Sequence, residues 1–251
     1  MHHNHIDRFA HGDSPVHRLD GRTKLLALVA YLAVLISFGR HDLVSLAPMA
    51  IWPAALLWLG GIPMRFALRR VVLLSPLILM LGVMSPLYDR GPMTLAAGPW
   101  QWQTTGGMLA GLTLATKFAL GVLAVTAVTC TTRFSSLLES MRRLGMPSLL
   151  VMQVGMLYRY LYVLVDEAMR VRLARDFRGA ALATTMRRLS AVGSIIGSLF
   201  VRTLDRSERI ALAMQARGYN AQTLAISPAR ISGIDLATML ATFVYLLICR
   251  W

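Results

Sequence analysis

The longest apolar run in the chain is Met108–Cys130, which reads MLAGLTLATKFALGVLAVTAVTC. A helix of about 20 apolar residues spans the hydrocarbon core of a bilayer, and this run is long enough to do so. Of the 251 residues, 56% are hydrophobic and only 15% are charged. A soluble domain has about 25% charged residues. The run and the composition together predict an integral membrane protein.

Four further apolar runs have the composition of spanning helices. They are Leu25–Phe38, Leu43–Ile62, Val71–Leu87 and Ile231–Ile248. The third contains two prolines, which membrane helices tolerate where neighbouring groups bond the freed carbonyls. Glycines and prolines in residues 88–107 predict a loop. The expected fold is an all-α integral membrane protein with about five transmembrane helices and a cytoplasmic helical domain inserted before the last span.

Basic residues are distributed unevenly over the two sides of this membrane. With the N-terminus inside, 22 of the 26 basic residues fall on the cytoplasmic side, and three fall outside: Arg40, Arg90 and Arg250. Cytoplasmic segments of membrane proteins carry an excess of Lys and Arg, so this split predicts a cytoplasmic N-terminus. Five spans then put the C-terminus outside.

The chain divides into four parts on this interpretation. Residues 1–24 form a cytoplasmic tail, residues 25–130 hold the first four transmembrane helices, residues 131–230 form the cytoplasmic domain, and residues 231–251 hold the fifth transmembrane helix and the C-terminus. The cytoplasmic domain alone contains 15 of the basic residues.

One stretch inside the cytoplasmic domain is apolar enough to be a span. Leu149–Val165 contains only Gln153 and Arg159 as polar residues. If it crossed the membrane, six arginines between residues 170 and 188 would lie outside, against the charge rule. We therefore interpret it as the apolar body of a long cytoplasmic helix that is buried against other helices.

Turn residues divide the cytoplasmic domain into three expected helices. They run over residues 134–144, about 148–177 and about 185–217. Gly145 suits a left-handed C-cap of the first, and Gly218 is the natural end of the third.

Two of these helices end in an Arg-Gly pair. The pairs lie in Phe177-Arg178-Gly179-Ala180 and in Ala216-Arg217-Gly218-Tyr219. An Arg in the last turn favours the helix dipole and a following Gly caps the helix, and most such pairs do no more. An Arg at an exposed helix tip also suits a bidentate bond to the carboxylate of a partner. Spacing alone leaves both interpretations open.

Several kinds of site are not expected. Cys130 and Cys249 lie in or at the end of apolar runs and are interpreted as buried hydrophobes. The basic residues lie between apolar spans, so nucleic acid is not an expected partner. His2, His3 and His5 are of a type that can bind a divalent transition metal, yet they lie in the polar tail, which favours a flexible tail over a metal site. We expect the chain to hold no metal and no cofactor.

An enzyme is also not expected. A membrane-embedded enzyme would need several ionisable residues that converge within the spans, and only Lys117 is expected there. Neither Lys24 nor Lys117 belongs to a Gly-rich phosphate loop, so any ATP hydrolysis would come from a partner.

Six short motifs occur in a characteristic order. They are His17-Arg18-Leu19-Asp20, Thr131-Thr132-Arg133-Phe134, Arg142-Arg143-Leu144-Gly145-Met146-Pro147, Leu157-Tyr158-Arg159-Tyr160, Asp166-Glu167-Ala168 and Gln215-Ala216-Arg217-Gly218-Tyr219. Together they resemble the transmembrane T component of energy-coupling factor (ECF) transporters, in its cobalt-type branch, CbiQ. The resemblance extends from about residue 6 to residue 251.

Members of that family carry two Ala-Arg-Gly signatures at the tips of their coupling helices. The second signature matches Ala216-Arg217-Gly218. The first falls at Phe177-Arg178-Gly179, where Phe replaces Ala, and Ala180 follows it. A rival match, Ala174-Arg175-Asp176, lacks the Gly and keeps Arg175 as a secondary contact. The resemblance therefore implies ATPase-coupling roles for these residues, with Arg178 favoured in the first signature.

The resemblance also implies a function and partners. The chain would be a non-catalytic, multi-pass subunit of an importer in the bacterial cytoplasmic (inner) membrane. Its cytoplasmic helices would dock on two copies of an ABC ATPase subunit. Its spans would hold a membrane substrate-binding subunit (a cobalt-type S component), beside a small accessory membrane subunit and lipid. Cobalt is the expected cargo, with nickel or a vitamin as alternatives. A non-transport membrane anchor for another cytoplasmic partner is a further alternative.

Overall fold

The computed structural model describes residues 12, 14–40, 42–88, 92–97, 100–177, 185–219 and 232–250. The chain forms two compact units. The membrane unit consists of residues 2–140 and 229–251, and the insert unit consists of residues 141–228. The division between them falls within a short helix, α5 (Phe134–Arg143).

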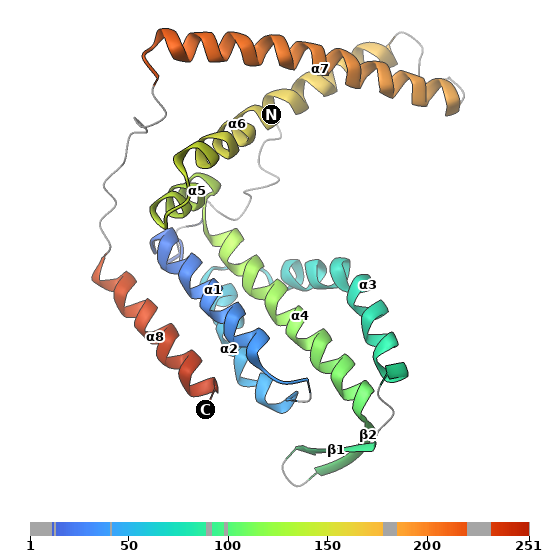
Figure 1. Cartoon of the computed structure of the whole chain (residues 1–251), viewed down its shortest axis with the longest axis vertical. Helices are drawn as coiled ribbons and strands as arrows, with labels where there is room; N and C mark the ends of the chain where they lie inside the picture. The colour runs from blue at the N-terminus through green and yellow to red at the C-terminus, as the bar shows by residue number, and fades with distance from the viewer. Residues whose placement is uncertain are drawn as a thin grey trace. The chain divides into compact units, whose positions relative to one another are not determined.

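Helices account for most of the described part of the membrane unit, which confirms the expected all-α membrane class (Figure 1). They are α1 (Gly21–Ser37), α2 (Ile51–Leu59), α3 (Met64–Tyr88), α4 (Gly106–Thr131) and α8 (Gly233–Arg250), with two 3-10 turns, η2 (Val44–Leu46) and η3 (Pro48–Ala50), ahead of α2. Helix α4 contacts α1, α2 and α3, while α1 also contacts α8. The longest apolar run of the sequence therefore forms the central helix of this unit.

Tyr31 of α1 compensates for a proline in the second helix. Pro53 has no N–H, so the carbonyl of Met49, four residues earlier, lacks its helical donor. The Tyr31 hydroxyl, which is fully buried, donates to that carbonyl at 3.0 Å. Tyr245 of α8 donates to the neighbouring carbonyl of Pro48. Side chains thus bond the irregular backbone, as a membrane-embedded segment requires.

We expect Tyr31→Phe to lower the free energy of unfolding by about 1–3 kcal/mol, because the buried carbonyl of Met49 would be left without a donor. Thermal unfolding of the purified chain in detergent would measure the loss. Tyr160→Phe, at a half-buried position in the insert unit, is the matched control and should change little. An equal loss in both variants would contradict this role of Tyr31.

Two segments of the membrane unit differ from the prediction. The expected single span over residues 43–62 is built of η2, η3 and the nine-residue α2, because Pro48 opens a new turn. Gly61, with φ of 65°, then ends α2. The expected loop over residues 88–107 contains an antiparallel hairpin of β1 (Pro92–Ala97) and β2 (Trp100–Thr105). Aromatic and polar residues alternate at the start of β2, which reads WQWQTT, and this alternation fits the two-residue period of a strand.

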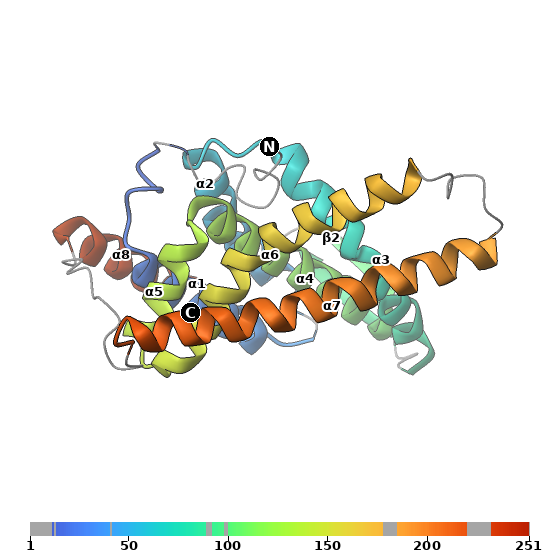
Figure 2. The same ribbon diagram turned by 90° about the horizontal axis from the view of Figure 1, so that it is seen from above.

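The insert unit holds two long helices, α6 (Ser148–Asp176) and α7 (Thr185–Ala216), which contact each other (Figure 2). Together with α5, they confirm the three expected helices to within one residue at each end. The expected glycine caps are confirmed as well, since Gly145 and Gly218 have φ of 105° and 69°.

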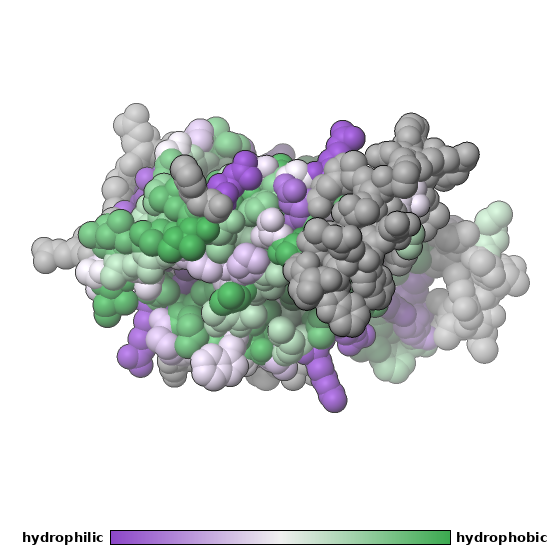
Figure 3. All heavy atoms as spheres, turned by 90° about the horizontal axis from the view of Figure 1, so that it is seen from below, coloured by the Kyte–Doolittle hydropathy of each residue, from purple (hydrophilic) through white to green (hydrophobic). Residues whose placement is uncertain are grey.

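Three helices in the described residues are long and apolar enough to cross a membrane: α4, α6 and α8. A shorter apolar stretch covers Val44–Leu59. Many large apolar side chains are exposed, as in α8, where 57% of Phe243 and 71% of Ile248 is accessible. Apolar residues also make up much of the coloured surface in Figure 3. These features fit a membrane protein, while the number of five spans stays a prediction.

Candidate functional site

Arg217 lies on a well-defined helix end. The amide of Tyr219 donates to the carbonyl of Met214 at 3.0 Å, and the amide of Gly218 donates to the carbonyl of Gln215 at 2.9 Å. This pair of bonds forms a Schellman cap, and the left-handed Gly218 makes it possible. Arg217 itself is exposed. The cap therefore ends α7 and leaves the guanidinium accessible, so the two interpretations of the Arg-Gly pair are compatible here.

Side-chain contacts fix α7 against α6. The Tyr219 hydroxyl donates to the sulfur of Met152, near the start of α6. Further along α6, Glu167 pairs with Arg202 at 3.1 Å and with Arg206 at 3.5 Å. Such exposed pairs contribute at most about 1 kcal/mol each. Their order along α7 is the reverse of their order along α6, so the two helices run antiparallel.

Arg175 lies toward the end of α7 that is remote from Arg217. Its guanidinium donates to the hydroxyl of Ser194 at 3.3 Å. Ser194 and Arg217 are separated along α7 by about 35 Å, at a rise of 1.5 Å per residue. The structure therefore places Arg175 and Arg217 at well-separated points of one helix pair.

The predicted site residues are not all within the described part of the chain. Arg178, Gly179 and Ala180 lie outside the described residues. Helix α6 ends just before them at Asp176, and Phe177 has 82% of its surface exposed. In the second signature, Ala216, Arg217 and Gly218 are all described and all exposed.

The apolar half of α6 is largely exposed within the described residues of the insert unit. Val151 is the one buried residue of this helix, whereas Leu149 and Leu157 have 55% and 66% of their surface exposed. Within the described residues of the insert unit, α7 leaves these side chains exposed, so the expected burial of α6 against other helices stays a prediction. Exposed apolar surface of this extent marks a site of contact with a partner protein or with lipid.

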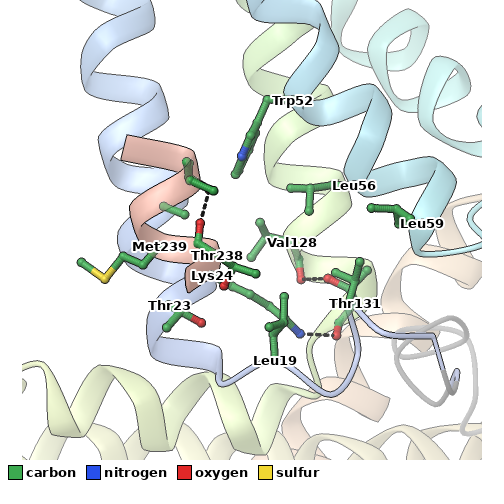
Figure 4. Close-up of a pocket in the computed structure, with 14 residues that line it drawn as sticks. Leu19, Thr23, Lys24, Trp52, Leu56, Leu59, Val128, Thr131, Thr238 and Met239 are labelled. Carbon is green, nitrogen blue, oxygen red and sulfur yellow. Dashed lines mark hydrogen bonds between the residues drawn. The ribbon is translucent and has the colours of Figure 1, made fainter. Parts of the chain in front are cut away.

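A buried polar junction lies where α1, α4 and α8 meet (Figure 4). Lys24, with 7% of its surface exposed, donates from Nζ to the carbonyl of Thr131 at 2.9 Å and to the hydroxyl of Thr132 at 3.4 Å. Thr131 is the last residue of α4, so the ammonium caps the negative end of that helix. Lys24 precedes the expected first span, and burial lowers its pKa to about 8 against the opposing effect of Asp235 and Asp20.

Asp235 connects α8 to α1 by a hydrogen bond at the same junction. Its Oδ1 accepts from the amide of Asp20 at 2.9 Å, and its Oδ2 accepts from the amide of Ser232 at 2.9 Å. Asp20 in turn caps α1 by accepting from the amide of Arg22. Asp235 has only 4% of its surface exposed. One buried carboxylate therefore bonds the N-terminal ends of two helices that are far apart in the sequence.

Lys117 caps the other end of α1. Its Nζ donates to the carbonyls of Phe38 and Gly39 at 2.6 and 3.2 Å, and Phe38 is the C-cap of α1. The only two lysines of the sequence thus cap each other's helices, because Lys24 of α1 caps α4 and Lys117 of α4 caps α1. This gives a structural role to the one charge expected within a span.

Within the described residues, no group of three or more His, Cys, Asp or Glu side chains is placed to hold a metal ion. His2, His3 and His5 lie outside those residues. Cys130 is a buried free thiol and Cys249 is half-buried, which fits their interpretation as small hydrophobes.

A family model described as "Cobalt transport protein", CbiQ, matches residues 12–225. The chain belongs to the CbiQ family. The energy-coupling factor transporter transmembrane protein EcfT of Lacticaseibacillus paracasei is 30% identical over 85% of this chain and 84% of its own length. EcfT of Thermosediminibacter oceani is 27% identical over 94% and 93%, and EcfT of Bacillus subtilis is 26% identical over 85% and 84%. These matches confirm the resemblance to ECF T components.

In the sequence, two of the six motifs indicate only membership of the CbiQ family. The structure shows that one residue of each motif has a hydrogen-bonding role. Asp20, at the end of the first motif, caps α1 and donates its amide to Asp235. Thr131, at the start of the second, accepts from Lys24. The sequence alone marks Lys24 and Asp235 only as charged residues at the edges of two apolar runs.

Proposed function

We propose that this CbiQ-family chain is the coupling subunit of an ATP-driven importer and performs no chemistry itself. Two copies of an ABC ATPase subunit would bind the insert unit and hydrolyse ATP. The membrane unit would bind a membrane substrate-binding subunit and a small accessory membrane subunit. The observation that carries the proposal is the exposed Arg217 on the capped end of α7. The printed names of the EcfT relatives, as ECF transporter transmembrane proteins, support it.

In this proposal the two Arg-Gly ends contact different ATPase subunits. Arg217 and Arg178 would each pair with a carboxylate in a groove of one ATPase subunit, and Arg175 would be a secondary contact. Ser194, which Arg175 contacts, lies about 35 Å from Arg217 along α7. This distance is too long for a single groove to bind both ends, so it supports two partner subunits. Closure of the ATPase pair would then act on both ends of the helix pair.

The proposed location is the bacterial inner membrane, with the N-terminus in the cytoplasm and the C-terminus outside. We also propose that α6 is cytoplasmic, although the helix is long and apolar enough to be a span. Its second half supports this, because Glu167 there pairs with Arg202 and Arg206 of α7. Placing α6 across the bilayer would bring these charges near the membrane, where they are costly.

The proposed cargo is cobalt, which the description of the matching family model supports. Cells that coexpress this chain with the ATPase and the substrate-binding subunit should accumulate radioactive cobalt, and ATP hydrolysis should copurify with the tagged chain. Excess nickel as a competitor separates cobalt from nickel transport. Uptake that continues without this chain would refute the proposal. A purified chain that never brings ATP hydrolysis with it would instead indicate a membrane anchor.

A further inference from the structure

A groove of about 610 Å³ runs along α4 between α1 and α3 of the membrane unit. Most of its lining is apolar, and Arg70 and Lys117 are the charged residues among the lining residues that the structure describes. Several of the apolar lining residues are exposed, with 76% of Ile36 and 49% of Leu74 accessible. Gly121 of α4 also lines the groove, and a Cβ built there would lie 3.6 Å from Leu32 and 3.9 Å from Leu35 of α1.

Arg70 provides the available positive charge of this groove. Its guanidinium carbon lies 4.8 Å from the centroid of the Phe66 ring, one turn nearer the N-terminal end of α3. The charge is therefore directed toward the end that the proposed orientation puts at the cytoplasmic face. Lys117, by contrast, is engaged by the carbonyls at the end of α1. None of the described lining residues is an Asp or Glu that could pair with Arg70.

We propose that this groove binds an anionic phospholipid of the cytoplasmic leaflet. The phosphate would lie on Arg70, and one acyl chain would lie over Gly121 and along Leu74 and Ile78, which follow Arg70 on the same face of α3 at intervals of four residues. The proposal uses the orientation given above and goes beyond the coupling function.

The chemistry of the groove favours this occupant over a helix of a partner protein. A guanidinium binds phosphate with two parallel hydrogen bonds. Basic pockets between transmembrane helices on the cytoplasmic side hold anionic head groups. An apolar partner helix would cover the lining but would leave Arg70 without a counter-charge, which is unfavourable in a bilayer.

Native mass spectrometry of the whole transporter complex would test the proposal. The complex is reconstituted in nanodiscs that contain equal amounts of phosphatidylglycerol and phosphatidylcholine, and the lipid retained after extraction is identified. Wild-type complex should retain phosphatidylglycerol in preference to phosphatidylcholine. Arg70→Gln should reduce that preference about fivefold, as expected for one basic residue at an anionic surface. Arg70→Lys should keep most of it, because the charge remains.

Arg69→Gln is the matched control. It removes the same charge from the residue just before Arg70 in α3, and Arg69 does not line the groove. It should leave the preference unchanged. Gly121→Leu, which adds a large side chain to the groove lining, should reduce retention of both lipids. Equal retention by the Arg70→Gln and Arg69→Gln variants would overturn the proposal. So would a photo-crosslinker at position 36 that traps a protein subunit in place of lipid.

Discussion

Replacing both Arg178 and Arg217 by Glu should abolish assembly of this chain with its ATPase subunits. Loss of an Arg from a buried charge pair costs about 2–5 kcal/mol, which weakens binding at least about thirtyfold at each site. Glu also places a negative charge against the proposed carboxylate of the partner, so the double variant should fail to copurify with the ATPase and should not support cobalt uptake. Copurification from solubilised membranes and an uptake assay measure the two outcomes.

Arg209→Glu is the matched control for this experiment, because Arg209 is an exposed arginine of α7 two turns before Arg217. It makes the same change of charge as Arg217→Glu alone and should leave assembly intact. In the proposal, Arg178 and Arg217 are the primary contacts and Arg175 is a secondary one. Arg217→Glu alone should then weaken ATPase binding more than Arg175→Glu alone. A double Glu variant that copurifies and transports like the unmodified chain would show that these ends are only helix caps.

Asp235→Ala should lower the free energy of unfolding of the membrane unit by about 3–6 kcal/mol. The carboxylate accepts from two backbone amides, those of Asp20 and Ser232, and hydrogen bonds to a charged group contribute about 1.5–3 kcal/mol each. Asp235→Asn keeps one accepting oxygen, so it should cost about half as much. Thermal unfolding in detergent would give the order of the variants.

The matched control for Asp235 is Asp42→Ala. Asp42 also accepts from a backbone amide, that of Gly39, but does so at the surface. Its loss should cost well under 1 kcal/mol, since water replaces an exposed bond. If the two alanine variants were equally stable, Asp235 would not be the fastening point between α1 and α8.

The helices of the insert unit could be predicted from the sequence because their ends depend on local chemistry. Gly145 and Gly218 supply left-handed caps whose bonding partners lie within five residues along the chain. The central position of α4 follows equally directly from its length and apolar composition. Hydrophobic patterning was less informative for residues 43–62, where Pro48 and Pro53 divide one apolar run into short pieces.

The polar junction could not be predicted in the same way. Lys24 bonds Thr131, and Asp20 bonds Asp235, across separations of 107 and 215 residues. No pattern of period or spacing relates residues so far apart. The exposure of α6 also could not be predicted, because an apolar helix face has the same sequence pattern whether this chain or a partner covers it. Arg217 could be proposed from the sequence because its signature is contiguous, and its accessibility was learned only from the structure.

The reciprocal lysine caps of α1 and α4 restrict how these two helices can move. Lys24 and Lys117 form their bonds at opposite ends of α1, so sliding α1 past α4 by one turn, about 5.4 Å, would break both sets of bonds together. Rotation of the pair as one body leaves them intact. A force applied at Thr131, the last residue of α4, would therefore tilt α1 and α4 together. Helix α8 would move with them, because Asp235 accepts a hydrogen bond from the amide of Asp20 at the start of α1.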